Sequence, residues 1–115
     1  MRTNKRVFLA LILILNVACT KEKVPTEFSG CSDTVSFSEV IAPLIQANCY
    51  DCHKPPSPAG NVLLTNHIEI ADEANRMLIA MQASGDELMP SGGPALNDSL
   101  IQYFQCWILQ GKLDN

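Results

Sequence analysis

The residues with the clearest capacity for chemistry are five consecutive positions, Cys49, Tyr50, Asp51, Cys52 and His53. Two thiols at this spacing on one helical turn point the same way, and each can add across a vinyl group of a porphyrin. The imidazole that follows them then lies over the iron and can bind it through one ring nitrogen. The motif occurs once in the chain. It therefore predicts one covalently bound haem c, attached through Cys49 and Cys52, with His53 as an axial iron ligand.

The same cysteine pair allows an alternative without redox chemistry. Cys49 and Cys52 can form a disulfide, or they can be half of a zinc site that His53 and either Cys31 or Cys106 complete. A structural zinc site usually has two ligand pairs at short spacing, whereas this chain has one pair beside one histidine. The haem interpretation is favoured, and a binding module stabilised by zinc or a disulfide is the alternative.

The first 18 residues have the organisation of an export signal. Three basic side chains precede an apolar run at 7–15, and small residues precede Cys19. The run is shorter than the roughly 20 apolar residues that a membrane-spanning helix needs. The stretch resembles a bacterial lipoprotein signal, in which Cys19 becomes the lipidated first residue of the mature chain. Asn16 departs from that pattern and leaves ordinary signal cleavage or an uncleaved anchor open.

The chain accordingly divides into a signal peptide at 1–18, a polar lipidated tether at 19–32 and one domain at 33–115. Loss of the first 18 residues removes three basic and no acidic side chains, so the formal net charge moves from -4 to -7. An acidic surface repels the phosphates of nucleic acids and favours basic protein partners or docking through an uncharged patch. We expect an exported protein on the periplasmic side of a bacterial membrane or in the cell envelope, bound to the membrane through its lipid and binding no nucleic acid.

Three segments have the apolar periodicity of helices. The first spans about 38–50, with Ser38 as its cap, although Pro43 favours a start nearer to the proline. The second has a predicted apolar face made of Ile68, Ala71, Ala74, Leu78 and Met81.

The third helix is the most clearly marked. Asn97 or Asp98 caps it, and Gly111 stops it; its apolar residues are Leu100, Phe104, Trp107 and Ile108. Proline and glycine make 54–60 and 84–98 loops. With no repeat and no hairpin signal, we expect an all-α domain.

Together these features resemble the small monohaem cytochrome c family, in particular its bacterial lipoprotein forms. The resemblance covers nearly all of the mature domain. It includes a helix leading into residues 49–53, a Met-Pro loop at Met89 and Pro90, and a final helix containing Trp107. It implies a cytochrome c-like fold, in which three main helices and long loops wrap around one covalently bound haem. It also implies that Met89 is the second axial iron ligand.

Other candidates for that position are weaker. Met77 and Met81 fall in the second helix at a spacing typical of core packing, and His67 lies near the start of that helix, where a histidine is more often solvated or a cap. The middle of the chain lacks the glycine and proline arrangement of mitochondrial members. The carbonyl that orients the iron-bound imidazole is therefore not carried over, and its candidates are Pro55, Pro56 and Pro58.

The resemblance further implies that the first and last helices pack together near the chain ends. Cys31 precedes the first helix and Cys106 lies in the last, which makes the two a candidate disulfide in an oxidising compartment. Two free thiols are the alternative.

Methionine and histidine ligation would leave no open iron position, which favours electron transfer over catalysis. The predicted function is a one-electron carrier between redox protein partners and not an enzyme; the partners are basic or dock at the haem edge. The alternative is a haem enzyme or a gas-binding sensor with an open distal site.

Overall fold

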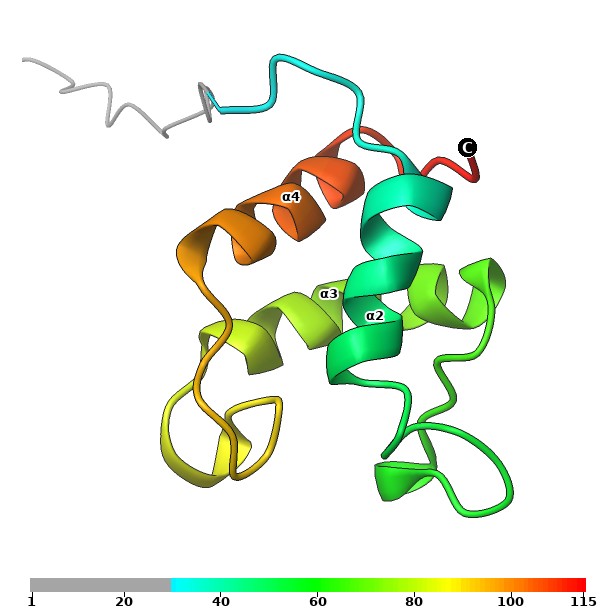
Figure 1. The fold of residues 1–115 in the computed structure, drawn as a ribbon, viewed down its shortest axis with the longest axis vertical. Helices are drawn as coiled ribbons and strands as arrows, with labels where there is room; N and C mark the ends of the chain where they lie inside the picture. Colours follow the sequence, from blue (N-terminus) through cyan, green and yellow to red (C-terminus); the bar gives the residue numbers. More distant parts are fainter. Residues whose placement is uncertain (1–29) are drawn as a thin grey trace, which may run out of the picture.

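The computed structural model describes residues 30–115, and within this range the chain forms three α-helices and no β-strand (Figure 1). They are α2 at Ala42–Asn48, α3 at His67–Gln82 and α4 at Asp98–Leu109. A π-helical turn, η2, at Phe37–Ile41 leads directly into α2, and the 3-10 turns η3 at Ala59–Asn61 and η4 at Gly85–Glu87 lie in the loops. The expected all-α class is confirmed.

The expected signal peptide, Cys19 and the tether up to residue 29 lie outside the described residues. Within residues 30–115, no helix has the length and apolar character needed to cross a membrane.

The α-helix itself begins at Ala42, next to Pro43, as the proline favoured. The π-helical turn before it begins at Phe37, one residue before the predicted cap Ser38. Ser36 is the N-cap instead, and its hydroxyl accepts a hydrogen bond from the Glu39 N–H at 3.2 Å. Asn115 also caps this end, because its side-chain oxygen accepts from the Phe37 N–H at 2.8 Å. Pro43 lies in the first turn of α2. Proline has no N–H to donate to the preceding turn, and the wider π-helical turn of η2 accommodates this loss.

The buried face of α3 agrees with the predicted one except at its start. Ala74 and Met81 are buried, and Ala71 and Leu78 pack against the core, as predicted. Ile68 is 71% exposed, and Ile70 is buried instead. Both isoleucines repeat at helical spacing with the residues that follow them, so periodicity alone did not separate them. The packing of α3 against α4 decides the rotation of the helix about its axis.

The ends of α4 are as expected. The Asn97 side chain accepts a hydrogen bond from the Leu100 N–H at 2.9 Å at the start. At the other end Gly111 adopts φ 94°, the Gly111 N–H donates to the Ile108 carbonyl, and the Lys112 N–H donates to the Trp107 carbonyl. This pair of bonds is a Schellman motif, which a left-handed glycine makes possible.

The core lies where η2 and α3 both pack on α4. Its most completely buried large side chains are Trp107, Phe104, Ile41 and Ile45. The rings of Phe37 and Trp107 are 5.7 Å apart between centroids. The first helical segment and the last helix therefore pack together, and this leaves the loops that follow α2 and α3 at the other end of the domain (Figure 1).

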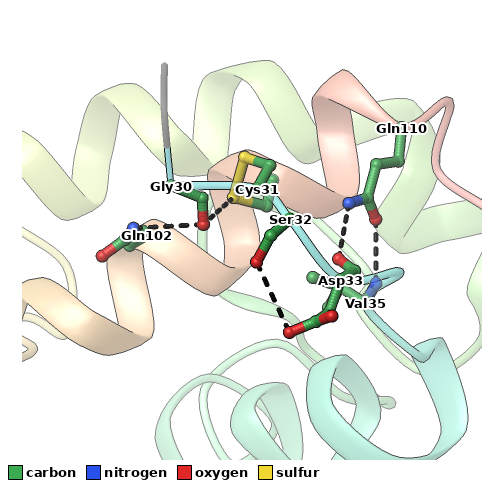
Figure 2. Close-up of a disulfide and its surroundings, with 8 residues drawn as sticks. Gly30, Cys31, Ser32, Asp33, Val35, Gln102 and Gln110 are labelled. Atoms are coloured by element: carbon green, nitrogen blue, oxygen red, sulfur yellow. Dashed lines mark hydrogen bonds between the residues drawn. A yellow bond between two sulfur atoms is a disulfide. The ribbon is translucent and has the colours of Figure 1, made fainter.

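The segment before η2 runs along α4 and is bonded to it (Figure 2). A disulfide joins Cys31 to Cys106, with Cα atoms 5.4 Å apart. The Gln110 side chain donates to the Asp33 carbonyl and accepts from the Val35 N–H, both at 2.8 Å. Residues 30–32, which the sequence analysis counted with the tether, are therefore attached to the folded domain.

Candidate functional site

The cysteine motif directly follows α2 and continues its direction for about one turn. The Cys49 N–H caps the helix by donating to the Ile45 carbonyl at 2.8 Å, and the His53 N–H donates to the Cys49 carbonyl at 3.1 Å. This turn brings the two thiols and the imidazole to the same end of α2. Neither Cys49 nor Cys52 is in a disulfide; the first is half-buried and the second is exposed.

His53 is held at its ring and at its backbone. Nδ1 lies 3.0 Å from the Val62 carbonyl, and the His53 carbonyl accepts from the Leu64 N–H at 3.0 Å. The loop returns to this point because the Ala59 N–H donates to the Cys52 carbonyl at 2.8 Å. Donation from Nδ1 to Val62 leaves Nε2 with a free lone pair, which is the form a metal binds.

The carbonyl beside the His53 ring therefore comes from Val62. It does not come from Pro55, Pro56 or Pro58, the candidates from the sequence. The prolines lie in the part of the loop that leads away from His53, and the chain comes back to the ring only after η3.

A cavity of about 460 Å³ lies beside the motif. That volume is within the range of roughly 300–1,000 Å³ that is usual for cofactor and ligand pockets. More of its wall is apolar than polar. The residues on its wall come from the end of α2, the two loops and α3: Asn48, Cys49, Cys52, His53, Ala59, Gly60, Val62, Leu64, Glu73, Arg76, Met77, Ala80, Met81, Met89, Pro90, Ser91 and Leu96. All four residues predicted to hold a haem are in this set.

Met89 reaches the cavity from the loop that follows α3. Its N–H donates to the Ala80 carbonyl at 3.0 Å, which ties this loop to the last turn of α3. Met89 is 37% exposed, so its thioether is not committed to the core. His53 comes from the loop after α2, and Figure 1 shows the two loops at the same end of the molecule, away from the C-terminus.

The competing candidates have different positions. Met77 and Met81 are buried in the core, as expected, and they also form part of the cavity wall on α3. His67 is not on that wall. Its Nε2 lies 2.8 Å from the Lys112 carbonyl, and its ring packs edge-on against Phe37 with centroids 4.7 Å apart. His67 thus links α3 to the two chain ends of the domain.

Two electrostatic features distinguish the cavity. Burial, with a smaller contribution from neighbouring Cys52, raises the pKa of the Cys49 thiol to about 11, so that this thiol is protonated at neutral pH. On α3, the Arg76 guanidinium donates to the Glu73 carboxylate at 2.8 Å. No feature of the sequence indicated that these two residues border a cavity.

The zinc alternative does not assemble its expected ligands. Cys31 and Cys106 are joined to each other, so neither is available to complete a site with Cys49, Cys52 and His53. Among residues 30–115, no group of three or more histidine, cysteine, aspartate or glutamate side chains is placed to hold a metal ion.

A second, more open hollow of about 510 Å³ lies between the end of α3 and α4. It shares Met81 and Leu96 with the first cavity, and no cysteine or histidine lines it. We therefore assign the candidate chemistry to the first cavity.

Comparison of the chain with protein-family models, with curated proteins and with solved structures gave no match.

Proposed function

We propose that this chain is a monohaem c-type cytochrome that carries single electrons between redox partners. The observation that supports the proposal is one cavity lined by Cys49, Cys52, His53 and Met89. These side chains are the two attachment thiols and the two iron ligands that a covalently bound, six-coordinate haem c requires. They come from two loops that are separated in the sequence by the whole of α3.

Each of these residues has a definite task. The Cys49 and Cys52 thiols would hold the haem by adding across its two vinyl groups; each S–H bond and each vinyl double bond would be replaced by a C–S and a C–H bond, with no net oxidation. His53 would bind the iron through Nε2, since the Val62 carbonyl holds Nδ1. The Met89 thioether would bind the iron as well. A haem held in this way would supply a one-electron change between ferric and ferrous iron.

The surroundings favour the carrier role. A soft, neutral thioether stabilises ferrous iron and raises the reduction potential relative to a second imidazole. With both His53 and Met89 bound, the iron would have no position left for a substrate. A haem enzyme or gas sensor would require Met89 to stay unbound.

We further propose export and a lipid anchor at Cys19, on the periplasmic side of a bacterial membrane or in the cell envelope. Residues 30–115 carry ten acidic and three basic side chains, a net charge of -7, which supports basic partners. The two loops beside the cavity differ from the rest of the domain in charge. Their segments 55–66 and 88–97 contain no charged residue. This distribution supports docking at the haem edge, with uncharged loops at the contact and acidic helices around it.

The decisive experiment is expression of the exported chain together with haem attachment machinery. We expect the polypeptide mass to exceed that of the lipidated chain by one haem, and a reduced-minus-oxidised spectrum of the c type. The double variant Cys49→Ser/Cys52→Ser should lose the haem mass.

The matched control is Cys31→Ser/Cys106→Ser, which replaces the same number of cysteines at the other end of the domain, where they form a disulfide, and should retain the haem. A wild-type mass equal to that of the bare chain plus lipid would contradict the proposal.

A further inference from the structure

The cavity wall contains one anionic and one permanently cationic side chain, Glu73 and Arg76. Both are on α3, three residues apart, and form an ion pair at 2.8 Å. Their side chains are 29% and 74% exposed respectively. The guanidinium therefore lies at the mouth of the cavity, in contact with solvent, while Glu73 is the more enclosed partner. His53 is the histidine on this wall, and the proposed function commits it to the iron.

A guanidinium has five N–H donors in a planar fork, and this shape matches the two oxygens of a carboxylate. The structure records one of these donors bonded, to Glu73. The remaining donors can meet a carboxylate at the edge of a ligand in the cavity. None of the other lining residues carries a lysine or arginine charge.

This inference rests on the proposed haem. A haem has two propionate groups, and a carboxylate beside an apolar wall is costly unless a charge or hydrogen bonds compensate it. The loop residues on the wall supply no charge. From the pair on α3 we infer that Arg76 binds a haem propionate at the mouth of the cavity, and that Glu73 orients the guanidinium for this contact.

The chain offers a matched comparison. Lys54 and Asp51 form a second ion pair three residues apart, at 2.6 Å. Lys54 follows the iron ligand His53 directly in the sequence, yet it is not on the cavity wall. Replacing Lys54 or Arg76 with glutamine removes one positive charge from an ion pair in each case. Only Arg76→Gln removes the guanidinium that would donate to the propionate.

The test uses the intact holoprotein of Arg76→Gln and Lys54→Gln, after haem content has been measured. Arg76→Gln should shift the propionate bending mode in the resonance Raman spectrum. It should also make the reduction potential depend on pH in the mildly acidic to neutral range, since a propionate without its cation has a higher pKa. Lys54→Gln should leave the Raman mode and the pH dependence at their wild-type values.

Identical spectra and pH profiles for the two variants would overturn the role of Arg76. Should Arg76→Gln fail to retain haem, Arg76→Lys decides the question, because it keeps the charge but loses the planar fork. A shifted propionate mode in that variant supports the contact, and an unchanged mode rejects it. Failure of the haem proposal itself is distinguishable, since the wild type would then contain no haem.

Discussion

Cys49 and Cys52, the proposed attachment residues, are in different environments although they are three positions apart. Cys49 is half-buried at the end of α2 and its thiol pKa is raised to about 11, while Cys52 is exposed. His53 is held in place by the Val62 carbonyl and the Leu64 N–H. The turn at 49–53 thus presents two free thiols and one oriented imidazole to the same cavity. Met89 comes from the other loop and is 37% exposed, so its role requires a separate test.

Replacing Met89 with alanine should abolish the sulfur-to-iron charge-transfer band of the oxidised holoprotein, because alanine has no thioether to bind iron. The open position should then bind cyanide or carbon monoxide rapidly, whereas the wild type should not. Absorption spectroscopy measures both effects.

Met77→Leu is the control, because Met77 is also on the cavity wall but is buried in the core. This near-isosteric change should cost less than about 1.5 kcal/mol and keep the band. An unchanged band in Met89→Ala would rule out Met89 as the ligand, and rapid ligand binding by the wild type would favour the enzyme or sensor alternative.

At the scale of elements, the ends of the helices determine where the cavity residues lie. α3 starts at an Asn66 cap, whose side chain accepts from the Glu69 N–H at 3.1 Å. The Glu69 carboxylate in turn accepts from the Thr65 N–H and hydroxyl, both at 2.8 Å. These bonds hold the pKa of Glu69 below its ordinary value. They also hold the end of the loop that brings Val62 to His53.

Glu69→Gln should lower the melting temperature at neutral pH, because the glutamine amide has no negative charge to attract the Thr65 N–H and hydroxyl. A carboxyl whose folded-state pKa is lowered stabilises the fold above its unfolded pKa, and this contribution disappears as the pH falls through the folded-state pKa. The difference in melting temperature between wild type and variant should therefore be largest near pH 7 and should shrink below about pH 4. Thermal melts across this range measure it.

Glu39→Gln is the matched control. Glu39 is also an acidic residue in a first helical turn, and among the described residues its carboxylate has no recorded hydrogen bond. Its replacement should have the smaller effect on the melting temperature. Equal effects of the two variants would show that the bonds to Thr65 are unimportant.

At the scale of the whole molecule, the domain is closed at one end by covalent and aromatic contacts and open at the other. The Cys31–Cys106 disulfide and the packing of Phe37 on Trp107 join the chain ends. The loops that line the cavity lie at the opposite end (Figure 1). A domain this small has a limited core, so the disulfide is expected to contribute much of its stability.

Cys31→Ala/Cys106→Ala should destabilise the domain by about 2–4 kcal/mol, because the disulfide closes a separation of 75 residues and restricts the unfolded chain. Denaturant unfolding of both proteins measures the difference. Thiol counting on the denatured wild type, before and after reduction, should show two additional thiols. No increase on reduction would contradict the bridge.

The turn that carries the cysteine motif, the all-α class and both ends of α4 could be predicted from the sequence, because each depends on residues a few positions apart. Spacing alone places two thiols and an imidazole on one turn, and Gly111 stops a helix. The cap of the first helical segment and the first member of the buried face of α3 were predicted wrongly. Ser36 and Ser38 are equivalent caps locally, and Ile68 and Ile70 both fit a helical period with the residues that follow them.

Only the tertiary structure decided that Met89 and His53 line one cavity, that Val62 supplies the carbonyl and that Arg76 is at the cavity mouth. These relations join segments that α3 or a long loop separates, so they depend on how the helices pack. Helix packing is selected by the shape of the whole core, which no short stretch of sequence contains.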